Sequence, residues 1–184
     1  MPSDRSLATE RLSLLATCTE HGDGLWAAVR ASIAELRPWM PWAIDPHHGD
    51  TLAFAVAAER QWDASAGWNF TIVENHDVIG SVGLDNYDAA VSACNLGYWL
   101  RTDRTGRGLM TEAAARVVAF GWDDIGLHRI ELRAARSNVA SARVAEKLGF
   151  RREGLLRDGS RGAGGYHDTH LYALLSSDPR PHDR

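Results

Sequence analysis

The chain has 184 residues, which is enough for one domain with a buried core. Its hydrophobic content of 45% and charged content of 24% are ordinary for a soluble globular protein. The formal net charge of −4 gives no global basic character, which argues against a nucleic-acid partner. No apolar run approaches membrane-spanning length, and residues 1–10 lack the apolar core of a signal peptide. We therefore expect a cytoplasmic protein without a membrane partner.

Neither the cysteines nor the histidines show a metal-binding pattern. Cys18 and Cys94 stand far apart in the sequence, and we expect both to be reduced thiols. The histidines at 47–48, 167 and 170 have no acidic or thiol partner at ligand spacing. The sequence therefore predicts no metal site.

The first half of the chain predicts a strand, two helices and a strand hairpin. We expect a strand at 9–15, a helix at 24–36 that Pro38 ends, a helix at 51–65, and strands at 68–74 and 78–84. The residues Asn75-His76-Asp77 predict the hairpin turn between the last two strands. The segment RPWMPW at 37–42 forms either a loop packed over the core or, with Trp39 and Trp42, one wall of a substrate cleft.

The second half predicts a strand–helix–strand crossover and a closing pair of strands. We expect a loop at 86–91, strands at 94–100 and 129–134 around a helix at 109–124, a helix at 142–148, and strands at 151–156 and 167–175 around a glycine-rich loop at 158–165. Gly126 and Gly149 suit helix C-terminal caps, and Asn138 suits an N-cap. The pattern predicts one α/β domain over 1–176 and a polar, disordered tail at 177–184.

The stretch 97–112, GYWLRTDRTGRGLMTE, carries the strongest chemical signal. Gly106 and Gly108 directly precede a helix, whose first N–H groups have no internal partner and carry partial positive charge from the macrodipole. Glycine permits a positive φ and the close approach of an anion to the backbone. Arg101, Arg104 and Arg107 add positive charge nearby. We interpret this segment as a pyrophosphate-binding turn, and the alternative is a tight turn that binds nothing.

Two other phosphate-binding motifs fail on spacing. A P-loop needs Gly-Lys-Ser/Thr, but Lys147 is the only lysine in the chain. A dinucleotide fingerprint needs a third glycine where Thr111 stands. Glu131 lies at a suitable distance for a ribose-binding acid, but no run of βαβ units surrounds it.

Together these segments resemble the GNAT acyl-CoA N-acyltransferases, and within them the RimJ/RimL type that acetylates ribosomal-protein N-termini. The resemblance runs over nearly the whole chain. Its segments are TERLSLL at 9–15, RPWMPW at 37–42, GYWL at 97–100, TGRGLMTEA at 105–113, SNVAS at 137–141, EKLGF at 146–150, EGLLR at 153–157 and GYHDTHLYALL at 165–175. It implies a GNAT fold, a single α/β (α+β) domain whose central mixed, mostly antiparallel sheet is flanked by helices and splays open beside strand 94–100.

The resemblance also implies that acetyl-CoA, as cosubstrate, enters the gap in the sheet. Its pantetheine would pair with the backbone of Tyr98, Trp99, Leu100 and Arg101, and its pyrophosphate would bind the amides of Arg104, Thr105, Gly106, Arg107, Gly108 and Leu109. Asn138 resembles the family's asparagine that contacts the pantetheine, and Ser141 resembles the serine near the CoA sulfur. Because relatives often form dimers, the resemblance also implies that this chain could form a homodimer.

Direct attack of an amine on the thioester, in a ternary complex, requires a deprotonated amine, donors for the oxyanion and a proton for the thiolate. We expect the backbone near Trp99 to supply the donors. Ser141 is the candidate for the thiolate proton, since Ala145 stands where many family members have a tyrosine. Glu131 is the first candidate for the general base, with a surface or ion-paired carboxylate as its alternative. Asp85 is the second candidate and lines the substrate site.

The acceptor is the least specified part of the reaction. Relatives often place acids at the positions of Asn95 and Ser160, and this chain has neither. Such weak base machinery suits an α-amine, with an unperturbed pKa of roughly 7.7–8.0, better than a lysine at roughly 10.4. We therefore expect a protein N-terminus as the acceptor. A small-molecule amine (an antibiotic or a metabolite) and a non-catalytic acyl-CoA-binding module remain open alternatives.

Overall fold

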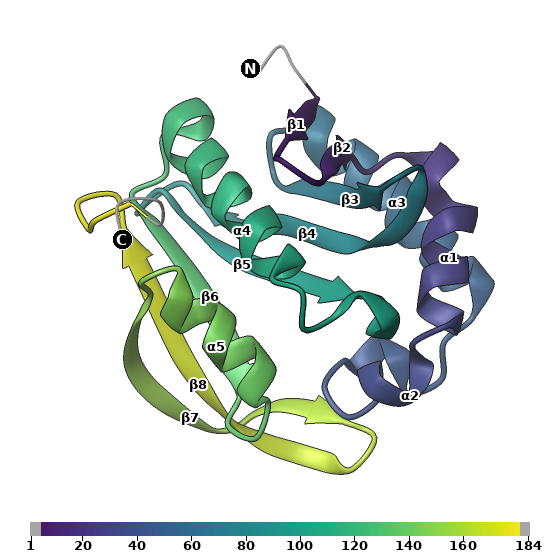
Figure 1. Ribbon diagram of the computed structural model, residues 1–184. Helices are drawn as coiled ribbons and strands as arrows, with labels where there is room; N and C mark the ends of the chain where they lie inside the picture. Colours follow the sequence, from purple (N-terminus) through teal and green to yellow (C-terminus); the bar gives the residue numbers. More distant parts are fainter. Residues whose placement is uncertain (1–4, 181–184) are drawn as a thin grey trace.

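The computed structural model describes residues 5–180, and within this range eight strands form one sheet in the order β1-β2-β3-β4-β5-β6-β8-β7 (Figure 1). All neighbouring strands are antiparallel except β5 and β6. The strands are β1 (Ser6–Ala8), β2 (Ser13–Ala16), β3 (Trp68–Glu74), β4 (Asp77–Asp88), β5 (Ala93–Leu100), β6 (Arg129–Ala135), β7 (Arg151–Gly162) and β8 (Gly165–Leu175). This mixed, mostly antiparallel sheet confirms the predicted fold class.

Helices cover the sheet on both faces. The α-helices are α1 (Gly22–Arg30), α2 (Ile33–Leu36), α3 (His48–Asp63), α4 (Leu109–Phe120) and α5 (Val139–Lys147), and short helical turns lie at Thr19–His21, Pro41–Ala43, Thr102–Arg104 and Gly121–Ile125. Figure 1 shows α4 and α5 in front of the sheet, and α1 and α2 at the right of the view. Among the described residues, no helix is both long and apolar enough to span a membrane.

The sheet opens between the two parallel strands, β5 and β6, which pair over only a short stretch. The strands β5 and β6 pair only at 93–95 with 129–131. Beyond that point β5 continues along β4 to Leu100, and β6 continues along β8 to Ala135 (Figure 1). The facing edges of β5 and β6 therefore diverge, which confirms the predicted splayed sheet.

Side-chain alternation along the strands separates an apolar face from a polar one. On the apolar face, Phe70 of β3 packs against Phe120 of α4, with ring centroids 5.4 Å apart, and both side chains are almost completely buried. The same face of the later strands presents Leu96 and Ile130 to the core cluster. The opposite face presents polar residues or glycines, namely Asn69, Thr71, Ser81, Gly83, Asp85, Asn95, Gly97 and Glu131.

Two predicted elements in the first half of the chain are wrong in detail. The strand predicted at 9–15 is a hairpin of β1 and β2, because Thr9 N–H bonds to the carbonyl oxygen of Leu12 at 2.9 Å and turns the chain. The helix predicted at 24–36 divides into α1 and α2 at Ser32, whose hydroxyl oxygen accepts the Thr102 N–H at 3.0 Å. The hairpin turn at Asn75 and His76 is confirmed, with φ of 49° and 70°.

Further differences concern strand and helix length. The strand predicted to end at Leu84 continues to Asp88 through a bulge, so part of the loop predicted at 86–91 is strand. The loop predicted at 158–165 is mostly strand, because β7 and β8 extend to a hairpin turn between Gly162 and Gly165. Helix α4 ends at Phe120 and continues as a wider turn to Gly126, whose φ of 77° confirms the predicted cap.

The predicted tail begins with residues that contact the domain. Asp178 forms an ion pair with Arg151 at 3.0 Å, and Arg180 forms one with Asp123 at 2.6 Å. The last four residues of the predicted tail, 181–184, lie outside the described residues.

Candidate active site

A cavity of about 870 Å³ occupies the opening between the two halves of the sheet. Its walls come from β4 and β5 on one side and from β6 and α5 on the other. Eight residues predicted for the site line this cavity, namely Trp39, Trp42, Asp85, Tyr98, Trp99, Glu131, Asn138 and Ser141. The remaining predicted residues, from Leu100 to Leu109, lie along the chain that leads from β5 into α4.

The turn before α4 has the backbone shape that the glycines predict. Gly106 and Gly108 have φ of 74° and 79°, and α4 begins at Leu109. The N–H groups of Arg104 and Thr105 bond to the carbonyl oxygens of Arg101 and Thr102 at 2.9 and 3.1 Å, which closes the preceding turn. These two N–H groups are therefore not available to a ligand. Since the first N–H groups of a helix have no intrahelical partner, the predicted anion site is reduced from the amides of residues 104–109 to those of residues 106–109.

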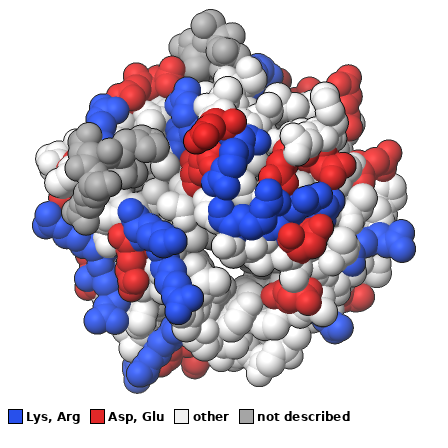
Figure 2. Space-filling view, in the orientation of Figure 1, with Lys and Arg blue, Asp and Glu red and all other residues white. Residues whose placement is uncertain are grey.

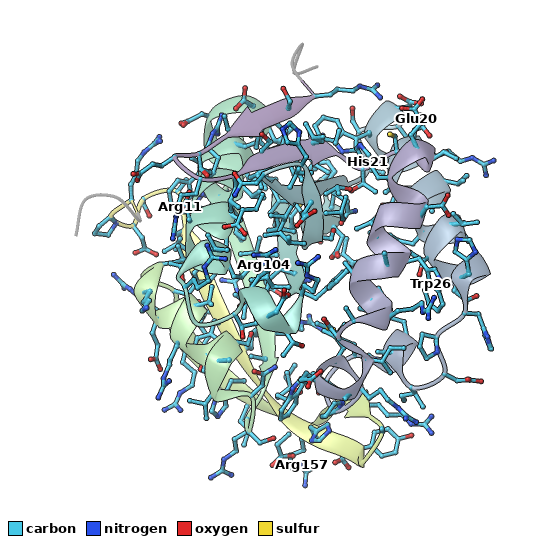
Figure 3. The ribbon with its side chains drawn as sticks, turned by 45° about the vertical axis from the view of Figure 1, so that its right-hand side comes forward. Arg11, Glu20, His21, Trp26, Arg104 and Arg157 are labelled. Carbon is cyan, nitrogen blue, oxygen red and sulfur yellow. The ribbon has the colours of Figure 1, made fainter. Side chains whose placement is uncertain are left out.

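The arginines of the turn are matched by carboxylates. Arg107 Nη2 lies 2.8 Å from an oxygen of Glu74, a buried residue at the end of β3. Arg104 pairs with Asp77 at 3.2 Å, and Arg101 pairs with Asp103 at 2.7 Å. Figure 2 shows basic and acidic side chains interleaved across this face, and Figure 3 labels Arg104 on it. The guanidinium groups therefore hold the turn against the β3–β4 hairpin instead of adding unbalanced positive charge.

A second contact fixes α4 from the other side. Arg11 donates from Nη1 to the Arg107 carbonyl oxygen at 3.0 Å and from Nε to Glu112 at 2.7 Å. Although burial opposes the shift, hydrogen bonds from Thr9 and Arg11 lower the pKa of Glu112. The β1–β2 hairpin is thereby tied to the first turn of α4.

Ser141 lies in a hydrogen-bonded group where α5 meets β5 at the wall of the cavity. Its main-chain N–H donates to Asn138 Oδ1 at 3.1 Å, which confirms Asn138 as the N-cap of α5. Its hydroxyl oxygen lies 3.0 Å from the Tyr98 hydroxyl, which also lies 3.3 Å from the Ser141 carbonyl oxygen. Burial raises the pKa of Tyr98 to about 12, so its phenol is protonated at neutral pH.

Asp85 and Asn95 face each other across β4 and β5. Asn95 donates from Nδ2 to Asp85 Oδ1 at 3.2 Å, and Asn86 donates to the same oxygen at 2.9 Å. Burial raises the pKa of Asp85, although these two hydrogen bonds oppose the shift. Asn95 Oδ1 is buried without a hydrogen-bond partner in the described structure.

Glu131 lies next to Asn95 in the sheet, but its carboxylate is ion-paired with arginine side chains. Arg129 donates to Glu131 Oε1 at 3.0 Å, and Arg133 lies 3.5 Å from Oε2. Arg129 also pairs with Glu153 at 2.6 Å. Accepting a proton on Glu131 would disrupt these contacts, which favours the ion-paired alternative of the sequence analysis.

Three tryptophans line the cavity, namely Trp39, Trp42 and Trp99. The rings of Trp42 and Trp99 lie 5.8 Å apart, and those of Trp39 and His167 also lie 5.8 Å apart. Trp42 is 42% exposed, so part of its ring remains open to a ligand.

Sequence reasoning missed the Tyr98 hydroxyl and the Asn95 side chain. The sequence predicts only a backbone role for Tyr98, and it identifies Asn95 only as a position where relatives often have an acid. Alternation along 94–100 places residues 95, 97 and 99 on one face and residues 96 and 98 on the other, a signal that was readable in the sequence. The partners of both side chains depend on tertiary contacts.

The family that matches this chain and two related proteins are acetyltransferases. The family described as "Acetyltransferase (GNAT) domain" matches residues 11–151. The [ribosomal protein uS5]-alanine N-acetyltransferase of Escherichia coli (strain K12) is 29% identical over 151 residues, covering 79% of this chain and 78% of that protein. The YdaF protein of Bacillus subtilis (strain 168) is 29% identical over 142 residues, covering 76% of this chain and 78% of that protein.

A solved structure also has this fold. RimL, a ribosomal L7/L12 α-N-protein acetyltransferase in complex with coenzyme A, superposes with a TM-score of 0.86 at 20% sequence identity. The superposition covers 92% of this chain and 96% of that chain.

The cap on α5 gives a stability prediction. Replacing Asn138 by alanine removes the acceptor for the Ser141 N–H and is expected to lower the free energy of unfolding by about 1 kcal/mol. Asn138→Ser retains a capping oxygen and should stay close to the wild-type value. Urea unfolding at pH 7 measures both, and an Asn138→Ala protein as stable as wild type would contradict the role of this cap.

Proposed function

Since the chain belongs to the GNAT family of acetyltransferases, we propose that this acetyl-CoA-dependent N-acetyltransferase modifies protein N-terminal α-amines, with ribosomal proteins as the leading acceptor class. The observation that carries the acetyl-CoA part of the proposal is the open edge of β5 beside the cavity, continued by a helix N-terminus that suits an anion. Similarity to a ribosomal-protein N-acetyltransferase supports the acceptor class. A cytoplasmic location, where ribosomal proteins are made, belongs to the same proposal.

The residues present fit acetyl-CoA, which supplies an activated acetyl thioester when it is bound. Beyond Asn95, the pairing of β5 with β6 stops, so the backbone from Leu96 to Leu100 has one edge available for hydrogen bonds with an amide-containing chain such as pantetheine. The amides at 106–109 then lie further along the same chain, where they suit the diphosphate. Backbone N–H groups near Trp99 are the proposed donors to the oxyanion.

Ser141 and Tyr98 together supply the proton for the departing thiolate. The Tyr98 hydroxyl lies 3.0 Å from Ser141 Oγ and 3.3 Å from the Ser141 carbonyl oxygen, and when it donates to Oγ the Ser141 proton is free to point elsewhere. Ser141 gives that proton to sulfur and receives one from Tyr98. A phenol from β5 thereby acts through Ser141, although α5 has alanine at position 145.

The acceptor class is tested by competition among amines. Thiol release from acetyl-CoA is followed with peptides that copy ribosomal-protein N-termini, with aminoglycosides, with polyamines and with aminoacyl nucleotides. We expect kcat/KM to be highest for the peptides. Reaction of the small molecules alone would reject the ribosomal acceptor, and acetyl-CoA binding without turnover of any amine would favour a non-catalytic module.

Ser141→Ala separates the proton donor from cofactor binding. We expect kcat to fall by about 100-fold, at the lower end of the range for a positioned general acid, while the Kd for acetyl-CoA stays near wild type. Tyr98→Phe should lower kcat less, because the serine proton remains. Stopped-flow thiol release and calorimetry measure the two quantities, and an unchanged kcat for Ser141→Ala would remove this residue from the mechanism.

Gly108→Val tests the turn before α4. At a φ of 79° a side chain strains the backbone, so the amides at 106–109 should lose their arrangement and the Kd for acetyl-CoA should rise by about tenfold or more. Gly164→Val is the matched control, since this exposed glycine has open space around it. Calorimetry on folded protein decides, and equal Kd values for Gly108→Val and wild type would contradict an anion site here.

A further inference from the structure

We propose that Asp85 is the general base of the reaction and that Asn95 positions the incoming nitrogen, so that the site selects primary amines. This inference rests on the proposed N-acetyltransferase function, and it names the group on the protein that takes the proton from the acceptor. It assigns to the β4–β5 pair the role that the sequence analysis gave first to Glu131.

The hydrogen bonds of Asp85 leave one of its oxygens directed at the cavity. Both amide donors, from Asn86 and Asn95, bond to Oδ1. The other oxygen, Oδ2, lies 3.4 Å from the position that a Cβ on Gly97 would occupy. Because Gly97 has no side chain, the space above β5 stays open next to Oδ2, and Gly97 itself lines the cavity.

Asn95 contributes a second acceptor at the same place. Its Nδ2 faces the Asp85 carboxylate, which fixes the orientation of the amide and leaves Oδ1 as an acceptor only. This oxygen is buried without a partner in the described structure, a state that is costly unless a ligand supplies a donor. Asp85 Oδ2 and Asn95 Oδ1 are both acceptors. Once the ammonium has lost its first proton to solvent through Asp85, they suit a neutral primary amine, whose two hydrogens they accept, whereas a neutral N-methyl amine has only one.

Glu131 is the adjacent alternative and is less suited to the task. It pairs with Asn95 in the sheet register, but Arg129 and Arg133 contact its two oxygens. The Asp85 carboxylate, by contrast, receives only neutral amide donors among the hydrogen bonds of the described residues. Burial raises its pKa, which moves this carboxylate towards the range in which a general base is effective.

The two reaction partners reach the gap from opposite faces of β5. Tyr98 and Ser141 lie on the side of α5, whereas Asn95, Gly97 and Trp99 point to the polar face. An amine held at Asp85 and Asn95 is therefore on the other side of the strand from the group that protonates the thiolate. This separation prevents the acid and the base from neutralising each other.

The proton balance follows from three hydrogens on the ammonium group. One passes to Asp85 before attack and then to solvent. The nitrogen lone pair forms the C–N bond while the C–S electrons leave with sulfur, and Ser141 protonates the thiolate. A second hydrogen then passes from the nitrogen to the Asp85 carboxylate and on to solvent, while Ser141 regains a proton from solvent through Tyr98. The third hydrogen remains on the amide product, so the net reaction releases one proton.

Other charged groups near Asp85 bear on its pH dependence. The neighbours on β5 and β6 are Cys94, whose pKa burial and the Asp85 charge raise to about 12, and the ion-paired Arg129 and Glu131. Further ionisable groups that line the same cavity are Asp88 on β4, His47 and Asp50 at the start of α3, and Arg133 on β6. Cys94 is a neutral thiol at neutral pH, and the two cations of β6, Arg129 and Arg133, already have acidic partners.

Asp85→Asn is the main test. Asp63→Asn is the control, since Asp63 is an exposed aspartate of α3 outside the residues that line the cavity, and it should keep wild-type activity. We expect Asp85→Asn to bind acetyl-CoA like wild type and to lose kcat/KM for a peptide amine by about 100-fold or more. Its residual activity should rise with pH as the amine deprotonates in solution. Glu131→Gln should retain most of the activity.

Stability measurements separate this role from a structural one. Burial raises the pKa of Asp85, so the folded state holds its proton more tightly than the unfolded state. The ionised carboxylate therefore lowers stability as the pH rises through the ordinary carboxyl range towards the raised value. Asp85→Asn removes this effect, and we expect a Tm at pH 7 equal to or above that of wild type.

Two further variants test the position of the amine. Gly97→Ala puts a methyl group in ordinary van der Waals contact with Asp85 Oδ2, so folding should persist while the KM for the amine rises by about tenfold. Asn95→Leu removes the hydrogen bond that lowers the pKa of Asp85, so the acidic limb of the kcat/KM profile should move to higher pH. Wild type should prefer a peptide amine over its N-methyl form by about tenfold, and Asn95→Leu should lose that preference.

The outcomes separate the two proposals. Asp85→Asn activity within about threefold of wild type, or loss of activity in Glu131→Gln alone, overturns the assignment of the base while the N-acetyltransferase function stands. Equal rates for the primary and N-methyl amines overturn the role of Asn95. Failure of the wild-type protein to release thiol with any amine contradicts the proposed function itself.

Discussion

The divergence of β5 from β6 is the constraint on which the site depends. Three residue pairs hold the strands together at 93–95 and 129–131, and then each strand follows a different neighbour. Backbone groups that would otherwise be paired inside a sheet become available at its centre. A cavity forms at the split, and the loop that leaves the end of β5 reaches the first turn of α4.

The ion pairs around the split hold its backbone in place. Because each arginine is paired with a carboxylate, they add little net positive charge that could attract an anion. Arg104 and Arg107 bind acids of the β3–β4 hairpin, Arg11 binds Glu112, and Arg129 binds Glu131. Main-chain amides are thus left as the groups suited to the diphosphate. Such fixed dipoles need no rearrangement when an anion arrives, which is an advantage for a site that must bind and release its cosubstrate repeatedly.

Much of this architecture was predictable from local sequence patterns. The glycines at 106 and 108, the cap at Asn138 and the period of the strands depend on neighbouring residues, and the structure agrees with them. The break at Ser32 was not predictable, because its cause is a hydrogen bond to Thr102, far along the chain. The long β7–β8 hairpin was missed because its glycines resemble a loop, although cross-strand pairing extends through them.

The candidate site was predictable as a set of residues but not as a set of contacts. Ser141 and Asn138 follow from a motif and Asp85 from its place at the end of a predicted strand, whereas the Tyr98–Ser141 contact and the Asp85–Asn95 pair depend on tertiary structure. The register between β4 and β5 shifts at the bulge after Asp85. The sequence predicts that the strand ends at Leu84, so it gives no sign of this bulge.

Hydrogen–deuterium exchange with and without acetyl-CoA tests the central claim, that the split in the sheet receives this cosubstrate. The account predicts slower amide exchange at 96–100 and 106–109 in the complex, with little change in β1, β2 and α3. Binding without protection in these two segments, or protection confined to another surface, would contradict it.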